Sequence, residues 1–164
     1  MFRELVYTIG HSNTGTVKFI SLLKQYGIKT VVDVRSAPYS RHVPQFNKDR
    51  IKTELMKEEI NYVFMGNVLG GKPEKFKGET SDDAKYRKIS LQEEYKNGIS
   101  RLIEIAKENK TSIMCSEENP ENCHRHLLIA KSLLAKGVEV KHIRGSGMVE
   151  DAGKQAFQAG LFGQ

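Results

Sequence analysis

The sequence predicts an α/β protein: a single three-layer domain with a mainly parallel sheet of about five strands and helices on both faces. Short β-branched or apolar runs alternate with longer segments of helical periodicity. The run at 30–34 is almost continuously apolar up to Asp33, as expected of a strand buried on both faces. The length of 164 residues suits one well-cored domain and is too short for two ordinary ones.

Each element has its own local signal. Five runs are predicted to be strands: Leu5–Ile9, Thr30–Val34, Asn61–Met65, Ser112–Cys115 and Val138–Ile143. Four helices are predicted between them: one capped by Asn13 or Thr14 and ending at Gly27, one with Ile51 and Leu55 on its buried side, one from about Ser90 to Asn109, and one ending at Gly137.

The chain divides into a domain over residues 1–144 and a tail. Within the domain, residues 72–89 are lysine-rich and weakly patterned, so we expect a basic segment that is either a mobile insertion or a lid. After residue 144 the composition changes to glycine and other small residues, which predicts a flexible or adaptable C-terminal tail over 145–164.

Composition restricts the partners and the compartment. The formal net charge of +6 favours anionic partners, either small molecules or nucleic acid. No apolar run approaches the ~20 residues that span a bilayer, so no membrane partner is expected. The first residues lack the layout of a signal peptide, and there are only two cysteines, so we expect a reducing, cytoplasmic location.

Polar side chains follow the predicted strands rather than precede them. In an open parallel sheet, ligands bind outside the carboxyl ends of the strands. The candidate residues for binding an anion or substrate are therefore His11, Ser12, Asp33, Arg35, Ser40, Arg41, Gly70 and Gly71. Asp33 and Arg35 lie on one face of a strand, so a structural ion pair is the alternative to a binding role.

The segment from Cys115 to Arg125 holds both cysteines and joins a predicted strand to a helix. Its candidate catalytic residues are Cys115, Glu117, Cys123, His124 and Arg125. We expect Cys115 to be the nucleophile or redox thiol, with His124 or Glu117 transferring protons. Arg125 would stabilise a thiolate or developing charge. Cys123 shares a helical stripe with apolar residues, so it is either a core residue or a second thiol with a pKa lowered by the helix N-terminus.

A metal site is the other interpretation of this segment. Cys115, Cys123 and His124 offer three ligands, and His11 or His142 a fourth. The spacing differs from that of a paired-cysteine zinc hook. Neighbouring residues on a helix also point about 100° apart, which opposes joint ligation by Cys123 and His124. No metal is therefore assigned from the sequence, and the cofactor is left open.

The chain resembles the family catalogued as domain of unknown function 488 over about residues 5–144. The resemblance rests on 8–12 (TIGHS), on 33–35 (DVR) with Pro38, Ser40 and Arg41, on 69–71 (LGG), and on Cys115-x-Glu117 leading to 123–125 (CHR). The family implies no established reaction, so the catalytic argument depends on the residues themselves.

The C-terminal tail contains a possible partner motif. Gln158, Leu161 and Phe162 resemble the short Gln-x-x-Leu-Phe peptides that dock onto the bacterial sliding clamp. The alternative is that the apolar side chains of this tail cover the domain.

Two functional hypotheses follow. The first is an enzyme with a Cys115-centred site that acts on an anionic substrate containing phosphate or a nucleotide. The second is a non-catalytic nucleic-acid-binding or adaptor module that its tail recruits to a sliding clamp. The second predicts binding that weakens steeply with salt and survives loss of the thiol.

Overall fold

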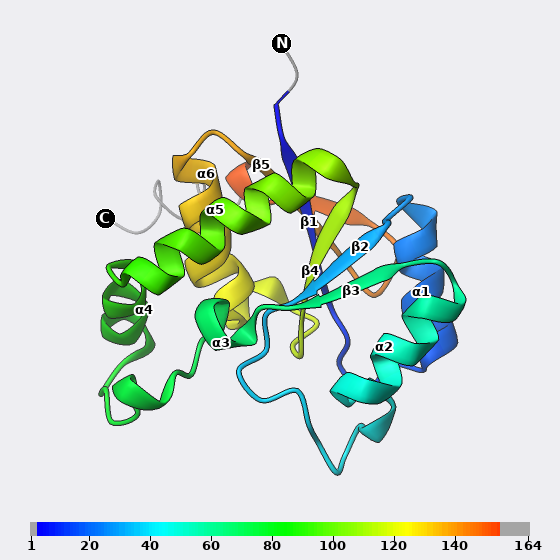
Figure 1. Cartoon of the computed structure of the whole chain (residues 1–164), viewed down its shortest axis with the longest axis horizontal. Coiled ribbons are helices and arrows are strands. Elements are labelled where there is room, and N and C mark those ends of the chain that lie inside the picture. The colour runs from blue at the N-terminus through cyan, green and yellow to red at the C-terminus, as the bar shows by residue number, and fades with distance from the viewer. Residues whose placement is uncertain (1–2, 155–164) are drawn as a thin grey trace.

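The computed structural model describes residues 3–154 of the chain and contains one six-stranded sheet (Figure 1). The strands are β1 (Leu5–Gly10), β2 (Thr30–Asp33), β3 (Asn61–Phe64), β4 (Thr111–Cys115), β5 (Glu139–Ile143) and β6 (Val149–Asp151). Their order across the sheet is β3-β2-β4-β1-β5-β6. All neighbouring pairs are parallel except β5 and β6. The predicted α/β class with a mainly parallel sheet is thus confirmed.

Helices cover both faces of the sheet. The longer ones are α1 (Thr16–Gln25), α2 (Lys48–Lys57), α4 (Asp82–Ser90), α5 (Glu93–Glu108) and the π-helical turn η4 (Arg125–Ala130) with its continuation α6 (Lys131–Ala135). Short elements are η1 (Pro44–Phe46), α3 (Gly66–Leu69), η2 (Glu74–Phe76) and η3 (Pro120–Asn122). Figure 1 shows α1 and α2 on one side of the strands and α5 and α6 on the other.

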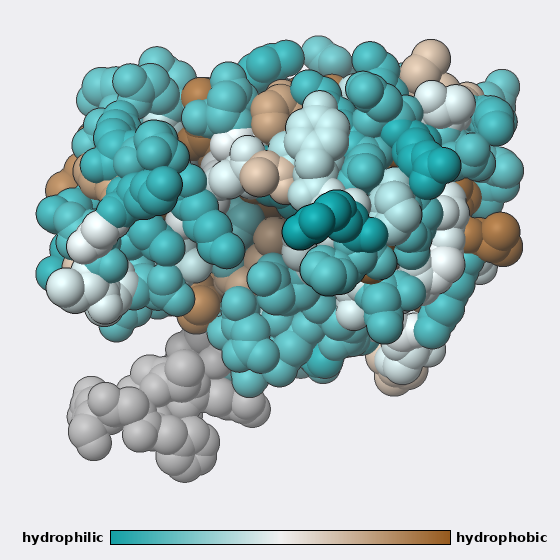
Figure 2. All heavy atoms as spheres, turned by 90° about the horizontal axis from the view of Figure 1, so that it is seen from below, coloured by the Kyte–Doolittle hydropathy of each residue, from teal (hydrophilic) through white to brown (hydrophobic). Residues whose placement is uncertain are grey.

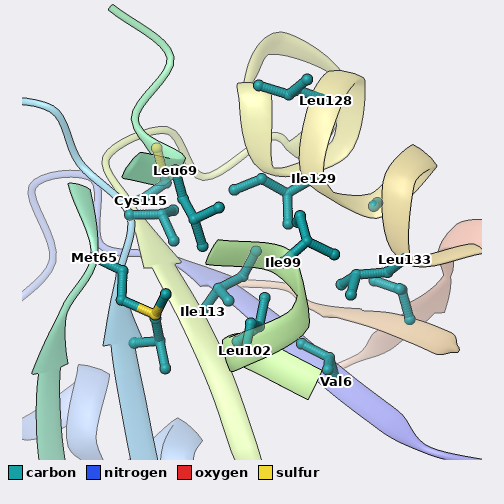
Figure 3. Packing of buried hydrophobic residues seen from close by; sticks show 14 of the residues in the cluster. Val6, Met65, Leu69, Ile99, Leu102, Ile113, Cys115, Leu128, Ile129 and Leu133 are labelled. Atoms are coloured by element: carbon teal, nitrogen blue, oxygen red, sulfur yellow. The ribbon is translucent and has the colours of Figure 1, made fainter. Parts of the chain in front are cut away.

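Each face of the sheet has its own apolar core. Successive strand residues point to opposite faces, so Tyr7 and Met114 pack with α1 and α2, whereas Val6 and Ile113 pack with α5 and α6. Figure 3 shows the second of these cores, with Cys115 beside Leu69 at its border. The apolar strands are therefore buried on both faces, as their composition predicts.

Two segments differ from the sequence-based expectation. The sheet has a sixth strand because residues 145–151, assigned above to the tail, turn back and pair β6 with β5. Gly147 supplies the positive φ of 91° in this turn, and the Arg144 N–H donates to the Met148 carbonyl over 2.8 Å. Within the basic segment 72–89, α4 begins at a cap in which the Ser81 hydroxyl accepts from the Ala84 N–H.

The connections that leave neighbouring strands diverge at the carboxyl end of β4. The chain leaves the neighbouring strands β1 and β2 toward α1 and α2, but it leaves β4 toward η4 and α6 on the opposite face. Connections that diverge in this way leave room for a ligand above the strand ends. Figure 2 views the molecule from this edge and shows a hollow near its middle, with hydrophilic residues around it and hydrophobic atoms inside.

Gly10 permits close approach of the loop after β4. It ends β1 opposite Cys115, and a Cβ atom on it would lie 1.7 Å from the Glu117 carbonyl oxygen. Any side chain at this position would push the loop that carries Glu117 away from the sheet.

A buried chain of hydrogen bonds links β1, β5 and η4 beneath this edge. The Arg125 Nε–H donates to the Thr8 hydroxyl oxygen over 3.0 Å, and that hydroxyl donates to His142 Nδ1 over 2.6 Å. His142 Nε2–H then donates to His126 Nδ1 over 2.9 Å. In this series of hydrogen bonds, the imidazoles of His142 and His126 are both neutral. Burial, with a smaller effect of the Arg125 charge, lowers the pKa of His142 to about 3.

We expect Gly10→Ala to destabilise the fold by about 3 kcal/mol or more. The added Cβ would overlap a backbone carbonyl, which cannot move away unless the loop after β4 is displaced. Gly15→Ala is the matched control: nothing lies within 4 Å of its Cβ position and its φ is −71°. The control should change the free energy of unfolding by less than about 1 kcal/mol. Urea unfolding measures both, and equal losses would contradict the proposed clash.

We expect His142 to make the fold sensitive to acid. Its folded pKa of about 3 lies below the unfolded value of 6.5, so the unfolded chain takes up the proton first. Its contribution to stability is therefore complete above pH 6.5 and declines as the pH falls from 6.5 toward 3. In His142→Gln, the free energy of unfolding should depend on pH less steeply, by about 1 kcal/mol per unit between pH 6 and 4. Parallel pH profiles of the two proteins would contradict this assignment.

Candidate functional site

The site lies at the carboxyl ends of β1, β2 and β4. Backbone hydrogen bonds extend the sheet beyond these strands: the His11 N–H donates to the Cys115 carbonyl over 3.0 Å, and the Ser12 N–H to the Ser116 carbonyl over 2.7 Å. On the other side of β4, the Val34 N–H donates to the Met114 carbonyl over 3.1 Å. The residues that follow three different strands are thus held at fixed positions relative to one another.

Both thiols contact the same imidazole nitrogen. His124 Nδ1 lies 3.6 Å from the sulfur of Cys115 and 3.8 Å from the sulfur of Cys123. Cys123 immediately precedes the helix and has extended backbone angles, φ −130° and ψ 144°. It is therefore not subject to the helical 100° spacing that argued against a joint role with His124. The two thiols and the imidazole therefore converge in space.

His124 is oriented by the backbone. Its Nε2–H donates to the Val34 carbonyl over 3.0 Å, so Nδ1 must face the two sulfurs. Gly71 lies against the ring, and a Cβ there would come within 2.8 Å of His124 Cγ. The glycine predicted at the site therefore serves to seat the imidazole. The role of the Val34 carbonyl has no sequence signal, because every residue carries one.

The two thiols differ in their electrostatics. The hydrogen bond from Cys115 lowers the pKa of Cys123, and His124 and Arg125 lower it further against the effect of burial. The Arg125 N–H at the start of the helix also donates to the Cys123 sulfur over 3.5 Å. The same hydrogen bond between the thiols, together with burial, raises the pKa of Cys115. Negative charge is thus favoured on Cys123, whereas the sequence argument preferred Cys115 as the reactive thiol.

Glu117 is the exposed acidic member of the site. The Cys115 thiol donates to its Oε2 atom over 3.5 Å. The side chain lies on the solvent side of the buried thiols, so the carboxylate can exchange protons with both Cys115 and water.

Arg125 acts on the loop rather than on the thiols alone. Its guanidinium donates to the Glu117 carbonyl over 2.6 Å and to the Glu118 carbonyl over 2.8 Å, in addition to the bond with Thr8. The Glu118 carboxylate in turn accepts from Arg144 Nε and Nη2 at 3.0 and 2.9 Å. These bonds hold the loop after β4 in place, so the guanidinium of Arg125 has a positioning role.

Asp33 and Arg35 form the ion pair that the sequence suggested. Arg35 donates to both carboxylate oxygens of Asp33, at 2.9 and 2.8 Å, and the Tyr62 hydroxyl donates to Asp33 at 2.5 Å. Arg35 also donates to His11 Nε2 over 3.3 Å, while His11 Nδ1–H donates to the Ser12 carbonyl over 2.7 Å. Burial lowers the pKa of His11 to about 4, so this ring is neutral.

The remaining predicted binding residues lie in the loops around the site. The Ser40 hydroxyl accepts from the backbone of His42 and Val43 and shapes the loop after β2. Arg41, in the same loop, is exposed. Gly70 packs against Ser36, whose hydroxyl oxygen would lie 2.2 Å from a Cβ at that position. Within residues 3–154, the hydrogen bonds of the thiols involve Glu117, His124 and Arg125 and none of these three predicted residues.

Tyr86 in α4 is a site neighbour that the sequence argument missed. Burial and the negative charges of Asp82, the two cysteines and Glu117 raise its pKa to about 12. The segment carrying Tyr86 was expected to be a mobile insertion or a lid, and its only sequence signal is an aromatic residue three positions before the buried Ile89. Its ring packs against the apolar core that includes both cysteines.

Two other expectations concern the tail and the membrane. Gln158, Leu161 and Phe162 lie outside the described residues. Across residues 3–154, none of the helices has the length and apolar character needed to cross a bilayer.

Comparison with known proteins places the chain in a family. The profile of a family described as domain of unknown function DUF488 matches residues 16–131, a span that includes Asp33, Arg35, Gly71 and the segment Cys115–Arg125. Searches of curated proteins and of solved structures found no match. The profile covers well over half of the chain, which therefore belongs to the DUF488 family.

Proposed function

We propose that this protein is a cysteine-dependent enzyme with its reaction centre at Cys115, Cys123 and His124, and that its substrate carries an anionic group. One observation carries the proposal: two thiols from different elements meet at one nitrogen of an oriented histidine, at the carboxyl edge of a parallel sheet. A purely structural pair of cysteines does not need an imidazole whose free nitrogen faces both sulfurs.

Each group has a role that its contacts support. In the metal-free protein, Cys123 is the nucleophile, because the Arg125 N–H donates to its sulfur and the neighbouring Cys115, His124 and Arg125 lower its pKa. Cys115 stabilises that thiolate and forms a path for protons to Glu117. His124 holds or releases a proton at Nδ1, since Nε2–H is occupied by the Val34 carbonyl.

Exposed cations, and not the buried arginines, are the groups that we propose to bind the anion. Arg35 and Arg125 already donate to internal acceptors. Lys72 is exposed, follows the glycine that contacts His124, and is tethered by its N–H to the Ser36 hydroxyl at 2.9 Å. Lys72 and the exposed Arg41 are therefore the residues that we propose to meet a phosphate group.

A second candidate is the nucleic-acid-binding or adaptor module. The formal net charge of +6 and the tail motif at Gln158, Leu161 and Phe162 favour it. A sliding clamp as partner and a cytoplasmic location belong to this proposal as well, the location because reduced thiols persist in reducing compartments. Clamp co-purification should disappear in a Leu161→Ala/Phe162→Ala protein of unchanged thermal stability. Clamp binding that survives this double substitution would exclude the tail as the docking motif.

We expect the chelator-treated protein to react with iodoacetamide at one thiol, with an apparent pKa at least one unit below the usual ~8.5. The Cys123→Ser variant should lose this reaction. Cys115→Ala should shift its pH profile upward, whereas Cys115→Ser, which keeps a donor, should shift it less. Mass spectrometry of the modified peptides identifies the thiol. A midpoint near 8.5 for both cysteines would contradict a poised thiolate.

We expect pyrophosphate to slow this alkylation if the site receives phosphate groups. Lys72→Ala should weaken the protection roughly tenfold, since a hydrogen bond to a charged group contributes about 1.5 kcal/mol or more. Lys52→Ala, an exposed lysine on α2, is the matched control and should leave the protection unchanged. Equal effects of both substitutions would indicate general charge screening instead of a site.

A further inference from the structure

We propose that Cys115, Cys123 and His124 form a binding site for a single thiophilic divalent cation, for which Zn²⁺ is the best match. Among the residues that the structure describes, these three form a group in which all ligand atoms lie within 4.8 Å of one another. This inference concerns the same three residues as the proposed function and otherwise does not depend on it.

The two N···S separations fit a tetrahedral ion, and the two sulfurs lie within 4.8 Å of each other. With Zn–S near 2.3 Å and Zn–N near 2.0–2.1 Å, the N···S edges of a tetrahedron are about 3.6 Å and the S···S edge about 3.8 Å. The Nδ1 atom of His124 lies 3.6 Å from the Cys115 sulfur and 3.8 Å from the Cys123 sulfur. An ion could therefore enter with only small shifts of these side chains.

The surroundings of the ligands already have the form of a metal site. A ligating histidine usually donates its second ring N–H to a carbonyl or carboxylate, and His124 Nε2–H donates to the Val34 carbonyl. The Arg125 N–H donates to the Cys123 sulfur and fixes its direction. These contacts are made by groups that would not themselves bind the ion.

The donor set selects the class of ion. Two thiolates and an imidazole are soft to intermediate ligands that suit Zn²⁺ and not Mg²⁺ or Ca²⁺. Two thiolates and one neutral imidazole also cancel the charge of a divalent ion, which favours a site where both cysteines are buried.

The group supplies three ligands among the described residues, so a tetrahedral ion would keep a fourth position, which we place on the side of Glu117 because this carboxylate lies beside one of the ligands. This carboxylate lies 3.5 Å from the Cys115 sulfur but is not a member of the three-ligand group. Three protein ligands with one open position are typical of catalytic zinc, whereas structural zinc has four. A water bound there would release its proton to Glu117 and leave a hydroxide on the ion, so the nucleophile of the zinc form would be this hydroxide.

Metal analysis of the full-length protein tests the inference. We expect one Zn²⁺ per chain after expression in zinc-supplemented medium, and one Co²⁺ per chain on titration of the stripped protein, with thiolate-to-cobalt absorption. Cys115→Ser, Cys123→Ser and His124→Asn should each weaken binding by roughly 100-fold or more, beyond the 10–100-fold loss typical of second-shell changes. His126→Gln is the matched control, because this buried histidine lies two residues further along the helix and outside the group.

Further measurements distinguish failure of the metal site from failure of the proposed function. Glu117→Gln should retain the affinity within about threefold of the wild type, well short of the loss typical of second-shell changes. A loss comparable to that of the cysteine variants would make Glu117 a fourth ligand and overturn the open position. No metal in the wild type, with low-pH alkylation of Cys123 intact, would overturn the metal site and leave the proposed function standing. One Zn²⁺ per chain, with thiols that react only near pH 8.5 once stripped, would support the metal site and overturn the thiolate nucleophile.

Discussion

The buried guanidinium of Arg125 organises the edge of the sheet where the candidate site lies. It is fully buried, and its N–H groups meet the Glu117 and Glu118 carbonyls and the Thr8 hydroxyl. A charge in this position is tolerated only because its donors find acceptors, and the loop after β4 offers carbonyls that need donors. Arg125 therefore donates hydrogen bonds to the carbonyls of the loop and also fixes the start of the next helix.

The orientation of the reactive groups follows from this anchor. Since Arg125 is held, the two residues before it emerge at a defined place, with His124 against Gly71 and Cys123 outside the helix. The Val34 carbonyl then decides which imidazole nitrogen faces the thiols. The site is thus preorganised by backbone groups from three strands, a rigid arrangement suited to chemistry.

The same geometry is compatible with a thiolate nucleophile and with a bound metal ion, because both require the two sulfurs and Nδ1 of His124 to lie close together. In the metal-free protein, the Cys115 thiol donates to Glu117, and negative charge is favoured on Cys123 rather than on Cys115. With an ion present, the two sulfurs and Nδ1 would instead share the charge of the cation. If the proposed ion binds, cysteine reactivity will depend on metal occupancy, because the same two sulfurs would serve both roles. The buried arginines belong to the scaffold in either form, and for this reason the proposed anion site uses exposed cations such as Lys72.

The sequence by itself determined the fold class and the strands of the parallel core, and it directed attention to the carboxyl edge of the sheet, because apolar periodicity and the polar residues after strands are local signals. It also identified the thiols, His124 and the Asp33–Arg35 pair. Only the tertiary structure decided how they meet. Cys123 lies just before the helix and has an extended backbone, and this conformation lets it share His124 with Cys115. The pairing of β6, the approach of Tyr86 and the contact with the Val34 carbonyl depend on residues distant in the chain. Such contacts come from packing and backbone groups, which leave no periodic pattern in the amino-acid sequence.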